Sequence, residues 1–187
     1  MNDDSPADTP KLSLRLAVAS YAVLTVIAFV WGALRGDANL FVYPGATRWP
    51  WWLNIALGLG FGLAVVALTQ IAHRYLAFTR ALSDEFAKIL GPREDWEIAL
   101  LAGTSGIGEE LFFRGAMQPS IGLVASSLIF GLLHIGPDRR FIVWTVFAIA
   151  IGFIFGLLFR YTGDLMAVIL AHFTINYFNL RLVTRRV

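Results

Sequence analysis

The sequence predicts an all-α polytopic membrane protein with about six transmembrane helices and a polar pocket buried among them. Hydrophobic residues make up 57% of the 187 residues and charged residues only 15%, whereas soluble domains are about a quarter charged. The apolar runs are continuous and long, as in spanning helices, and do not alternate as barrel strands do. This composition excludes a disordered chain, a fibrous repeat and an ordinary water-soluble globule. The chain has no cysteine, which also excludes disulfides, thiolate metal sites and a cysteine nucleophile.

The first 95 residues are predicted to form a tail, two spans and an interfacial segment. Residues 1–13 contain three aspartates and two prolines, and we expect them to be a short disordered tail in the cytoplasm. Within residues 14–95, Leu16–Leu34 and Trp51–Ala72 are uncharged and reach the roughly 20 residues that a helix needs to cross a bilayer. The charges and helically spaced apolar residues from Arg74 to Glu97 predict an amphipathic helix at the membrane surface.

Residues 96–187 are predicted to form a core of four further helices. The third span runs from about Trp96 to Gln118, and the fourth from about Ser120 to Gly136. The fifth, Phe141–Phe159, and the sixth, Leu165–Leu180, contain no Asp, Glu, Lys or Arg. We therefore expect a four-helix core that follows two N-terminal helices.

The distribution of basic residues predicts the orientation, because cytoplasmic loops are enriched in Lys and Arg. Eleven lie on one side of the predicted bundle: Lys11, Arg15, Arg74, Arg80, Lys88, Arg93, Arg139, Arg140, Arg181, Arg185 and Arg186. Only three lie on the other side: Arg35, Arg48 and Arg160. We expect an integral membrane protein, in the inner (cell) membrane of a bacterium, with both termini cytoplasmic. The basic pI of about 9.2 therefore reflects topology and does not indicate a nucleic-acid partner.

A small set of ionisable and amide side chains lies inside the predicted spans. A charge at the bilayer centre costs about 2.5–3.5 kcal/mol even on a lenient scale, so such residues are expected to face one another or a wet cavity. The third span carries Glu109, Glu110 and Arg114, the fourth His134, and the sixth His172 and Asn176.

Helical spacing predicts how these side chains face. Glu110 and Arg114 are four residues apart and can pair, while Glu109 points about 100° away and stays free. His172 and Asn176 form one stripe in the same way. Phe130 precedes His134 by four residues and shares its face. At ~1.5 Å per residue, the polar set lies roughly 12–20 Å deep.

This combination fits hydrolysis of an amide or ester inside the membrane. A carboxylate and a histidine together can hold a water molecule and take its proton. An imidazole N–H and an amide N–H on an adjacent helix can donate to a developing oxyanion. The Glu110–Arg114 pair then supports the free glutamate. No cofactor is required by this chemistry.

A metal site is the alternative use of the same residues. Glu109, His134 and His172 make a His₂Glu set, which some zinc hydrolases use. The sequence lacks an H-E-x-x-H motif, so three separate helices would have to assemble the site.

Three motifs resemble one known family. These are Glu109-Glu110-x-x-x-Arg114 within EELFFRG, Phe130-x-x-x-His134 within SSLIFGLLH, and His172-x-x-x-Asn176 within ILAHFTINY. In this order and on successive apolar segments they are similar to the CPBP family, the CAAX prenyl proteases and bacteriocin-processing enzymes also called Abi proteins. The resemblance covers roughly residues 95–180.

The resemblance implies an intramembrane endopeptidase that acts on a membrane-embedded or lipidated peptide or protein. It implies that Glu109 and His134 activate water, that His172 and Asn176 form the oxyanion hole, and that Glu110 and Arg114 support them. The family has been described both as metal-dependent and as glutamate-dependent without metal.

A non-enzymatic membrane protein is the rival interpretation of the same sequence. An immunity or scaffold protein needs no catalysis, and a small proton-coupled carrier could use Glu109 and the histidines as a relay. No internal repeat is evident in the sequence, which argues against a carrier built from duplicated halves.

Overall fold

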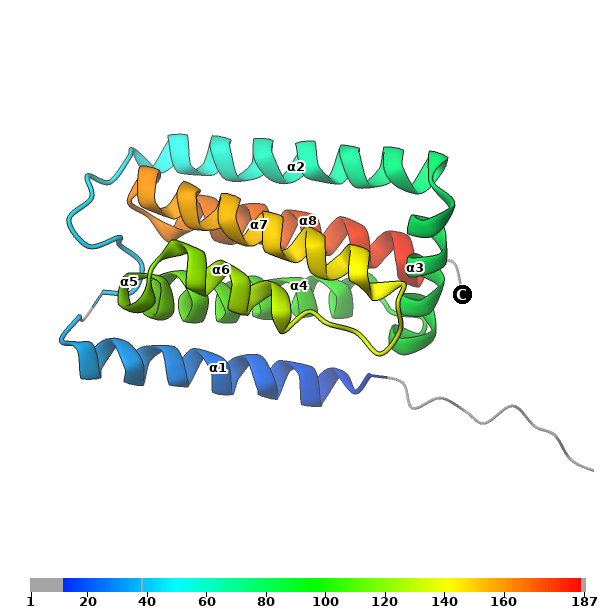
Figure 1. The fold of residues 1–187 in the computed structure, drawn as a ribbon, viewed down its shortest axis with the longest axis horizontal. Coiled ribbons are helices and arrows are strands. Elements are labelled where there is room, and N and C mark those ends of the chain that lie inside the picture. Colours follow the sequence, from blue (N-terminus) through cyan, green and yellow to red (C-terminus); the bar gives the residue numbers. More distant parts are fainter. Residues whose placement is uncertain (1–11, 38, 186–187) are drawn as a thin grey trace, which may run out of the picture.

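The computed structural model describes residues 12–37 and 39–185, which form helices joined by short connections (Figure 1). The predicted tail at residues 1–13 therefore lies almost entirely outside the described residues. The elements in chain order are α1 (Leu14–Arg35), α2 (Trp51–Tyr75), α3 (Ala77–Leu90), α4 (Asp95–Glu110), η1 (Leu111–Met117), α5 (Gln118–Ile121), α6 (Leu123–Leu132), α7 (Phe141–Thr162) and α8 (Leu165–Thr184).

Four of these helices, α1, α2, α7 and α8, are long and apolar enough to cross a membrane. The helix α4 continues without a break into η1 and corresponds to the predicted third span. The expectation of about six spans therefore agrees roughly with the structure, and the chain is an all-helical integral membrane protein.

The fourth predicted span, about Ser120 to Gly136, is wrong in extent. Its helix, α6, has only 10 residues and is about 15 Å long at 1.5 Å per residue. Gly122, with a φ of 88°, separates α6 from α5, because such a backbone angle breaks a helix and favours glycine. The helix ends at Leu132, so His134 lies in the turn that follows it.

The predicted amphipathic segment is the helix α3, which lies across one end of the bundle (Figure 1). The same end holds both described ends of the chain. The Leu12 N–H donates to the Ile89 carbonyl at the end of α3, and Arg181 and Arg185 of the C-terminal segment pair with Asp95. Both described ends of the chain therefore lie on one side of the bundle.

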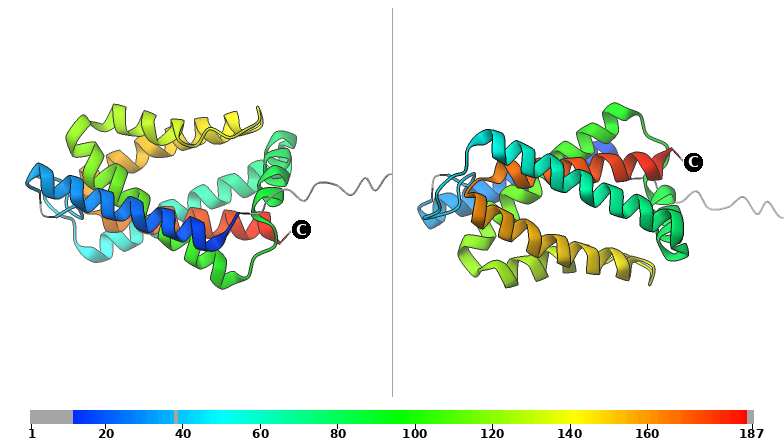
Figure 2. Two further views of the ribbon diagram at one scale, coloured as in Figure 1. Left: turned by 90° about the horizontal axis from the view of Figure 1, so that it is seen from below. Right: turned by 90° about the horizontal axis from the view of Figure 1, so that it is seen from above.

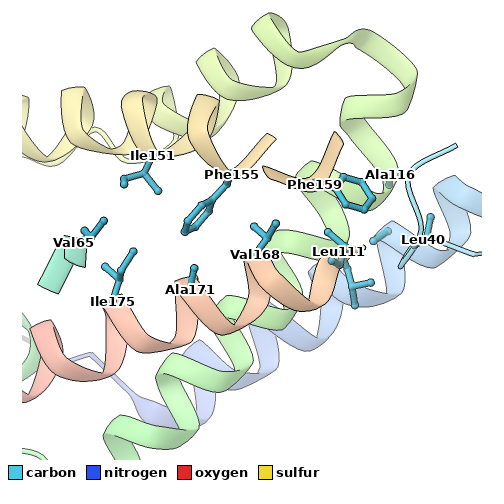
Figure 3. Close-up of a cluster of buried hydrophobic side chains, with 12 residues drawn as sticks. Leu40, Val65, Leu111, Ala116, Ile151, Phe155, Phe159, Val168, Ala171 and Ile175 are labelled. Atoms are coloured by element: carbon cyan, nitrogen blue, oxygen red, sulfur yellow. The ribbon is translucent and has the colours of Figure 1, made fainter. Parts of the chain in front are cut away.

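The centre of the bundle is the helix α8, which packs along α2 on one side and along α4 on the other. Two glycines of α2 permit close approach, since an added Cβ would lie 2.5 Å from the Ala167 carbonyl oxygen at Gly58 and 2.8 Å from Thr174 at Gly62. A cluster of buried apolar side chains fills the space between α8, α7 and η1 (Figure 3). It includes Leu111, Phe155, Phe159, Val168, Ala171 and Ile175.

The helices α6 and α7 form a hairpin that is fastened to the rest of the bundle at the end opposite α3. There Gln118 donates to the Gly156 carbonyl at 2.9 Å, and Arg114 donates to the Gly152 carbonyl at 3.3 Å. Toward α3 the hairpin diverges from α8 (Figure 2). A cavity of about 530 Å³ occupies this opening and is lined by residues of α1, α2, α3, α4, α6, α7 and α8.

Candidate active site

The two glutamates stand at the end of α4, where the α-helix changes into the π-helix η1. In η1 the hydrogen bonds reach back five residues, as from the Gln118 N–H to the Phe113 carbonyl. Such π-helical turns are rare and often occur at functional sites. The sequence predicted a regular helix here, so this irregularity is new information from the structure.

Glu110 is the centre of a buried ion-pair cluster. Its Oε1 accepts hydrogen bonds from Arg114 Nη1 at 3.2 Å and from His172 Nδ1 at 2.6 Å. The Glu110 side chain is 0% exposed and that of Arg114 2%. The expected Glu110–Arg114 contact is present. The structure adds His172 to it and thereby joins η1 to α8 through one carboxylate.

The Arg114 guanidinium lies in an aromatic cage. It stands 4.4 Å from the ring centroid of Phe130, 5.5 Å from that of Phe155 and 5.9 Å from that of Phe113. Ring faces attract a guanidinium, especially where water is excluded. Phe130 also lies 4.5 Å from the His134 ring, so one aromatic side chain holds both the arginine and the first histidine of the site.

Glu109 faces both histidines of the predicted site. Its Oε2 lies 3.9 Å from His134 Nε2 and 3.9 Å from His172 Nε2. Glu109 Oε2 is buried and has no hydrogen-bond partner among the described residues. A water oxygen can sit about 2.8 Å from both atoms of such a pair, so the spacing leaves room for one water between carboxylate and imidazole.

Hydrogen bonds at the other ring nitrogens fix which imidazole atoms carry protons. His134 Nδ1 lies 2.6 Å from the Phe130 carbonyl oxygen, and His172 Nδ1 binds the Glu110 carboxylate. Both partners only accept hydrogen bonds, so both Nδ1 atoms are donors. In the neutral rings Nε2 therefore carries a lone pair toward Glu109.

Asn176 lies on the same cavity wall as His172, one turn further along α8. Its Nδ2 donates to Ser105 Oγ at 2.9 Å, which ties α8 to α4. Sequence reasoning missed Ser105, although it precedes Glu109 by four residues and therefore shares its helix face.

Tyr21 of α1 is a second residue that sequence reasoning missed. It lines the same cavity as Glu109, and its phenol interacts with the Glu109 carboxylate. The sequence offered no signal for it, because a tyrosine in an apolar span is common and α1 carries no motif.

The donor types around Glu109 fit zinc, and each histidine has the kind of outer partner that metal-binding histidines use. Within the described part of the chain, however, no three His, Asp or Glu side chains are gathered closely enough to hold a metal ion as they stand.

Comparisons with known proteins cover the part of the chain that holds this site. Residues 93–178, just under half of the chain, match the family described as type II CAAX prenyl endopeptidase Rce1-like. The uncharacterized protein YpbD of Bacillus subtilis (strain 168) is 38% identical over 91 residues, which make up 48% of this chain and 47% of YpbD. The chain thus spans about half the length of this curated relative. No solved structure matches the chain significantly.

The matched segment contains every motif residue of the site: Glu109, Glu110, Arg114, Phe130, His134, His172 and Asn176. The resemblance to CPBP proteins and the membrane-spanning helices agree with this match. Residues 93–178 are therefore similar to the Rce1-like family of type II CAAX prenyl endopeptidases.

Proposed function

We propose that this chain is an intramembrane endopeptidase that hydrolyses a peptide bond of a membrane-associated protein or peptide without a cofactor. The observation that carries this proposal is the convergence of a carboxylate oxygen and two imidazole nitrogens at the wall of a largely apolar cavity. Glu109 Oε2 lies 3.9 Å from each of the two imidazole Nε2 atoms and has no hydrogen-bond partner among the described residues.

In the proposed reaction Glu109 and His134 hold a water molecule and take its proton as the oxygen attacks the scissile carbonyl carbon. The Nδ1–H of His134 is bound to a backbone carbonyl, which leaves Nε2 free to accept a hydrogen bond from the water while the Glu109 carboxylate takes the proton. The proton is then passed to the leaving amine as the C–N bond breaks. Glu110, Arg114 and Phe130 hold these groups and do not exchange protons with the substrate.

His172 and Asn176 are proposed to stabilise the oxyanion. Since Nδ1 of His172 donates to Glu110, its Nε2 can donate to the oxyanion only when the ring is an imidazolium. The charges of the site favour that form. Glu109 and Glu110 carry two negative charges against the single positive charge of Arg114, and a proton on one histidine makes the cluster neutral, as low-dielectric surroundings require.

The shape of the cavity supports access from the cytoplasm. It extends from Glu109 to Leu12, Phe78 and Leu182 at the α3 end of the bundle, where both described ends of the chain lie. The excess of Lys and Arg on this side favours a cytoplasmic location. We propose an inner-membrane protein of a bacterium with both termini in the cytoplasm. In this proposal residues 14–95 flank a catalytic core at 96–187 that draws a membrane-embedded or lipidated substrate from the bilayer.

Replacement of His134 tests the proposal. We expect the purified protein in lipid vesicles to cleave some members of a panel of lipidated and unlipidated membrane peptides, and His134→Ala to cleave none of them above background. Mass spectrometry of the products measures this. Asp84→Asn, at an exposed position of α3, is the control and should cleave normally. If parent and His134→Ala release the same products at the same rate, the protease proposal is wrong, and an immunity, scaffold or carrier role takes its place.

Metal removal separates the two forms of the proposed chemistry. We expect cleavage by the parent protein to survive prolonged dialysis against a strong chelator, because the proposed base and oxyanion donors are side chains of the chain itself. Elemental analysis of the active protein should find less than one zinc for every ten chains. Loss of cleavage in chelator, with recovery on addition of zinc, would instead establish Glu109, His134 and His172 as ligands.

A further inference from the structure

We propose that Tyr21 of α1 is a positioning residue that holds the Glu109 carboxylate for its reaction with water. This inference rests on the proposed function and adds a residue from outside the family-matched segment, residues 93–178. It makes α1 part of the catalytic apparatus and not only a helix that covers it.

The helices α1 and α4 pack closely at the residue before Glu109. Gly108 precedes Glu109, and a Cβ added at Gly108 would lie 3.0 Å from the Tyr21 carbonyl oxygen and 3.3 Å from the Tyr21 Cβ. A larger residue at 108 would push the two helices apart. The glycine therefore brings the Tyr21 side chain beside the first glutamate.

The phenol of Tyr21 is directed into the site. Tyr21, Glu109 and His134 line both the cavity of about 530 Å³ and a second one of about 510 Å³. The phenol interacts electrostatically with the Glu109 carboxylate. By contrast, the hydroxyls of Ser20 and Thr25 in the same helix donate to carbonyls of α1 itself.

A phenol O–H donates to a carboxylate, and such a bond restricts the carboxylate to one orientation. The other groups that face Glu109 are His134, His172 and, electrostatically, Arg114. Both imidazole nitrogens stand 3.9 Å away, too far for direct hydrogen bonds. The Tyr21 phenol is therefore the protein group suited to fix the Glu109 carboxylate, while Glu109 Oε2 stays open to water.

The test compares Tyr21→Phe with Tyr161→Phe in the full chain in lipid nanodiscs. Tyr161 is 69% exposed and lies outside the site, so it is the matched control. We expect Tyr21→Phe to lower kcat about tenfold to a hundredfold, the equivalent of one hydrogen bond to a charged group. KM should change less than twofold, and the melting temperature should stay within about two degrees of the parent's.

An infrared measurement tests the contact without relying on cleavage. The carboxylate stretch of Glu109 is isolated as the difference between each protein and its Glu109→Gln partner. We expect this band to shift in Tyr21→Phe and to keep its position in Tyr161→Phe. An unchanged band in Tyr21→Phe overturns the proposal, whatever the protein cleaves. A shifted band with no cleavage by the parent supports the Tyr21–Glu109 contact and rejects the protease function alone.

Discussion

Glu109→Gln should reduce peptide cleavage by about 10²–10⁴-fold, the range associated with loss of a general base. Glutamine has nearly the same shape as glutamate, so the cavity and the packing of α4 should be preserved. Its amide cannot accept the proton of the attacking water, and it cannot balance a proton on His172. The measurement is the initial rate of cleavage in lipid vesicles, with the melting temperature recorded for the same preparation.

The structure also predicts that Glu109→Gln does not destabilise the fold. Glu109 Oε2 has no hydrogen-bond partner within the described residues, and both imidazoles lie 3.9 Å away. The glutamine carbonyl can still accept from the Tyr21 phenol, so removing this buried charge breaks no strong contact, and the melting temperature should stay the same or rise. Asp84→Asn makes the same chemical change on the surface of α3 and should leave the rate unchanged. A Glu109→Gln protein that cleaves within threefold of the parent would falsify a glutamate base.

Contacts between residues four apart on one helix could be predicted from the sequence, because helical geometry places such residues on one face. The i,i+4 spacing of Glu110 and Arg114 indicated a pair, and the structure has it at 3.2 Å. The same holds for Phe130 and His134, whose rings lie 4.5 Å apart, even though His134 has left the helix. Local spacing fixes such contacts, so they survive changes in where a helix ends.

Contacts between distant helices were beyond the sequence. Nothing in the spacing indicated that His172 Nδ1 would bind the carboxylate that also binds Arg114, because this depends on how α8 is rotated against α4. Tyr21 and Ser105 were missed for the same reason. Tyr21 reaches the site only because Gly108 permits the close contact of α1 and α4, and this requires the three-dimensional arrangement.

The ends of helices were also poorly predicted where apolar composition continues past them. The run from Ser120 to Gly136 is hydrophobic throughout, but its helix covers only Leu123–Leu132. The shortening changes the structure at the proposed site. In a helix that continued to Gly136, the Phe130 carbonyl would accept from the backbone N–H of His134. In the observed turn that N–H donates to the Gly131 carbonyl, so the Phe130 carbonyl can accept from the His134 imidazole.

Arg114→Met should destabilise the protein by about 3–5 kcal/mol, the cost of leaving a buried charge without its partner. Methionine keeps most of the apolar stem that packs against Phe130 but removes the guanidinium. Glu110, whose side chain is 0% exposed, then keeps only the hydrogen bond from His172 among the side chains of the described residues. The measurement is the free energy of unfolding in mixed micelles. Arg160→Met is the control, since Arg160 is exposed at the end of α7, and should cost less than about 0.5 kcal/mol.

The double variant Glu110→Gln/Arg114→Met separates stability from catalysis. Removing both buried charges should recover much of the stability lost in Arg114→Met, because no unpaired charge remains. The glutamine carbonyl can still accept the His172 Nδ1–H, so the imidazole should stay in place. A neutral amide stabilises an imidazolium far less than a carboxylate does, and cleavage should therefore remain low. If stability and cleavage recover together, Glu110 and Arg114 serve the fold alone; if stability recovers without cleavage, the carboxylate also acts on His172.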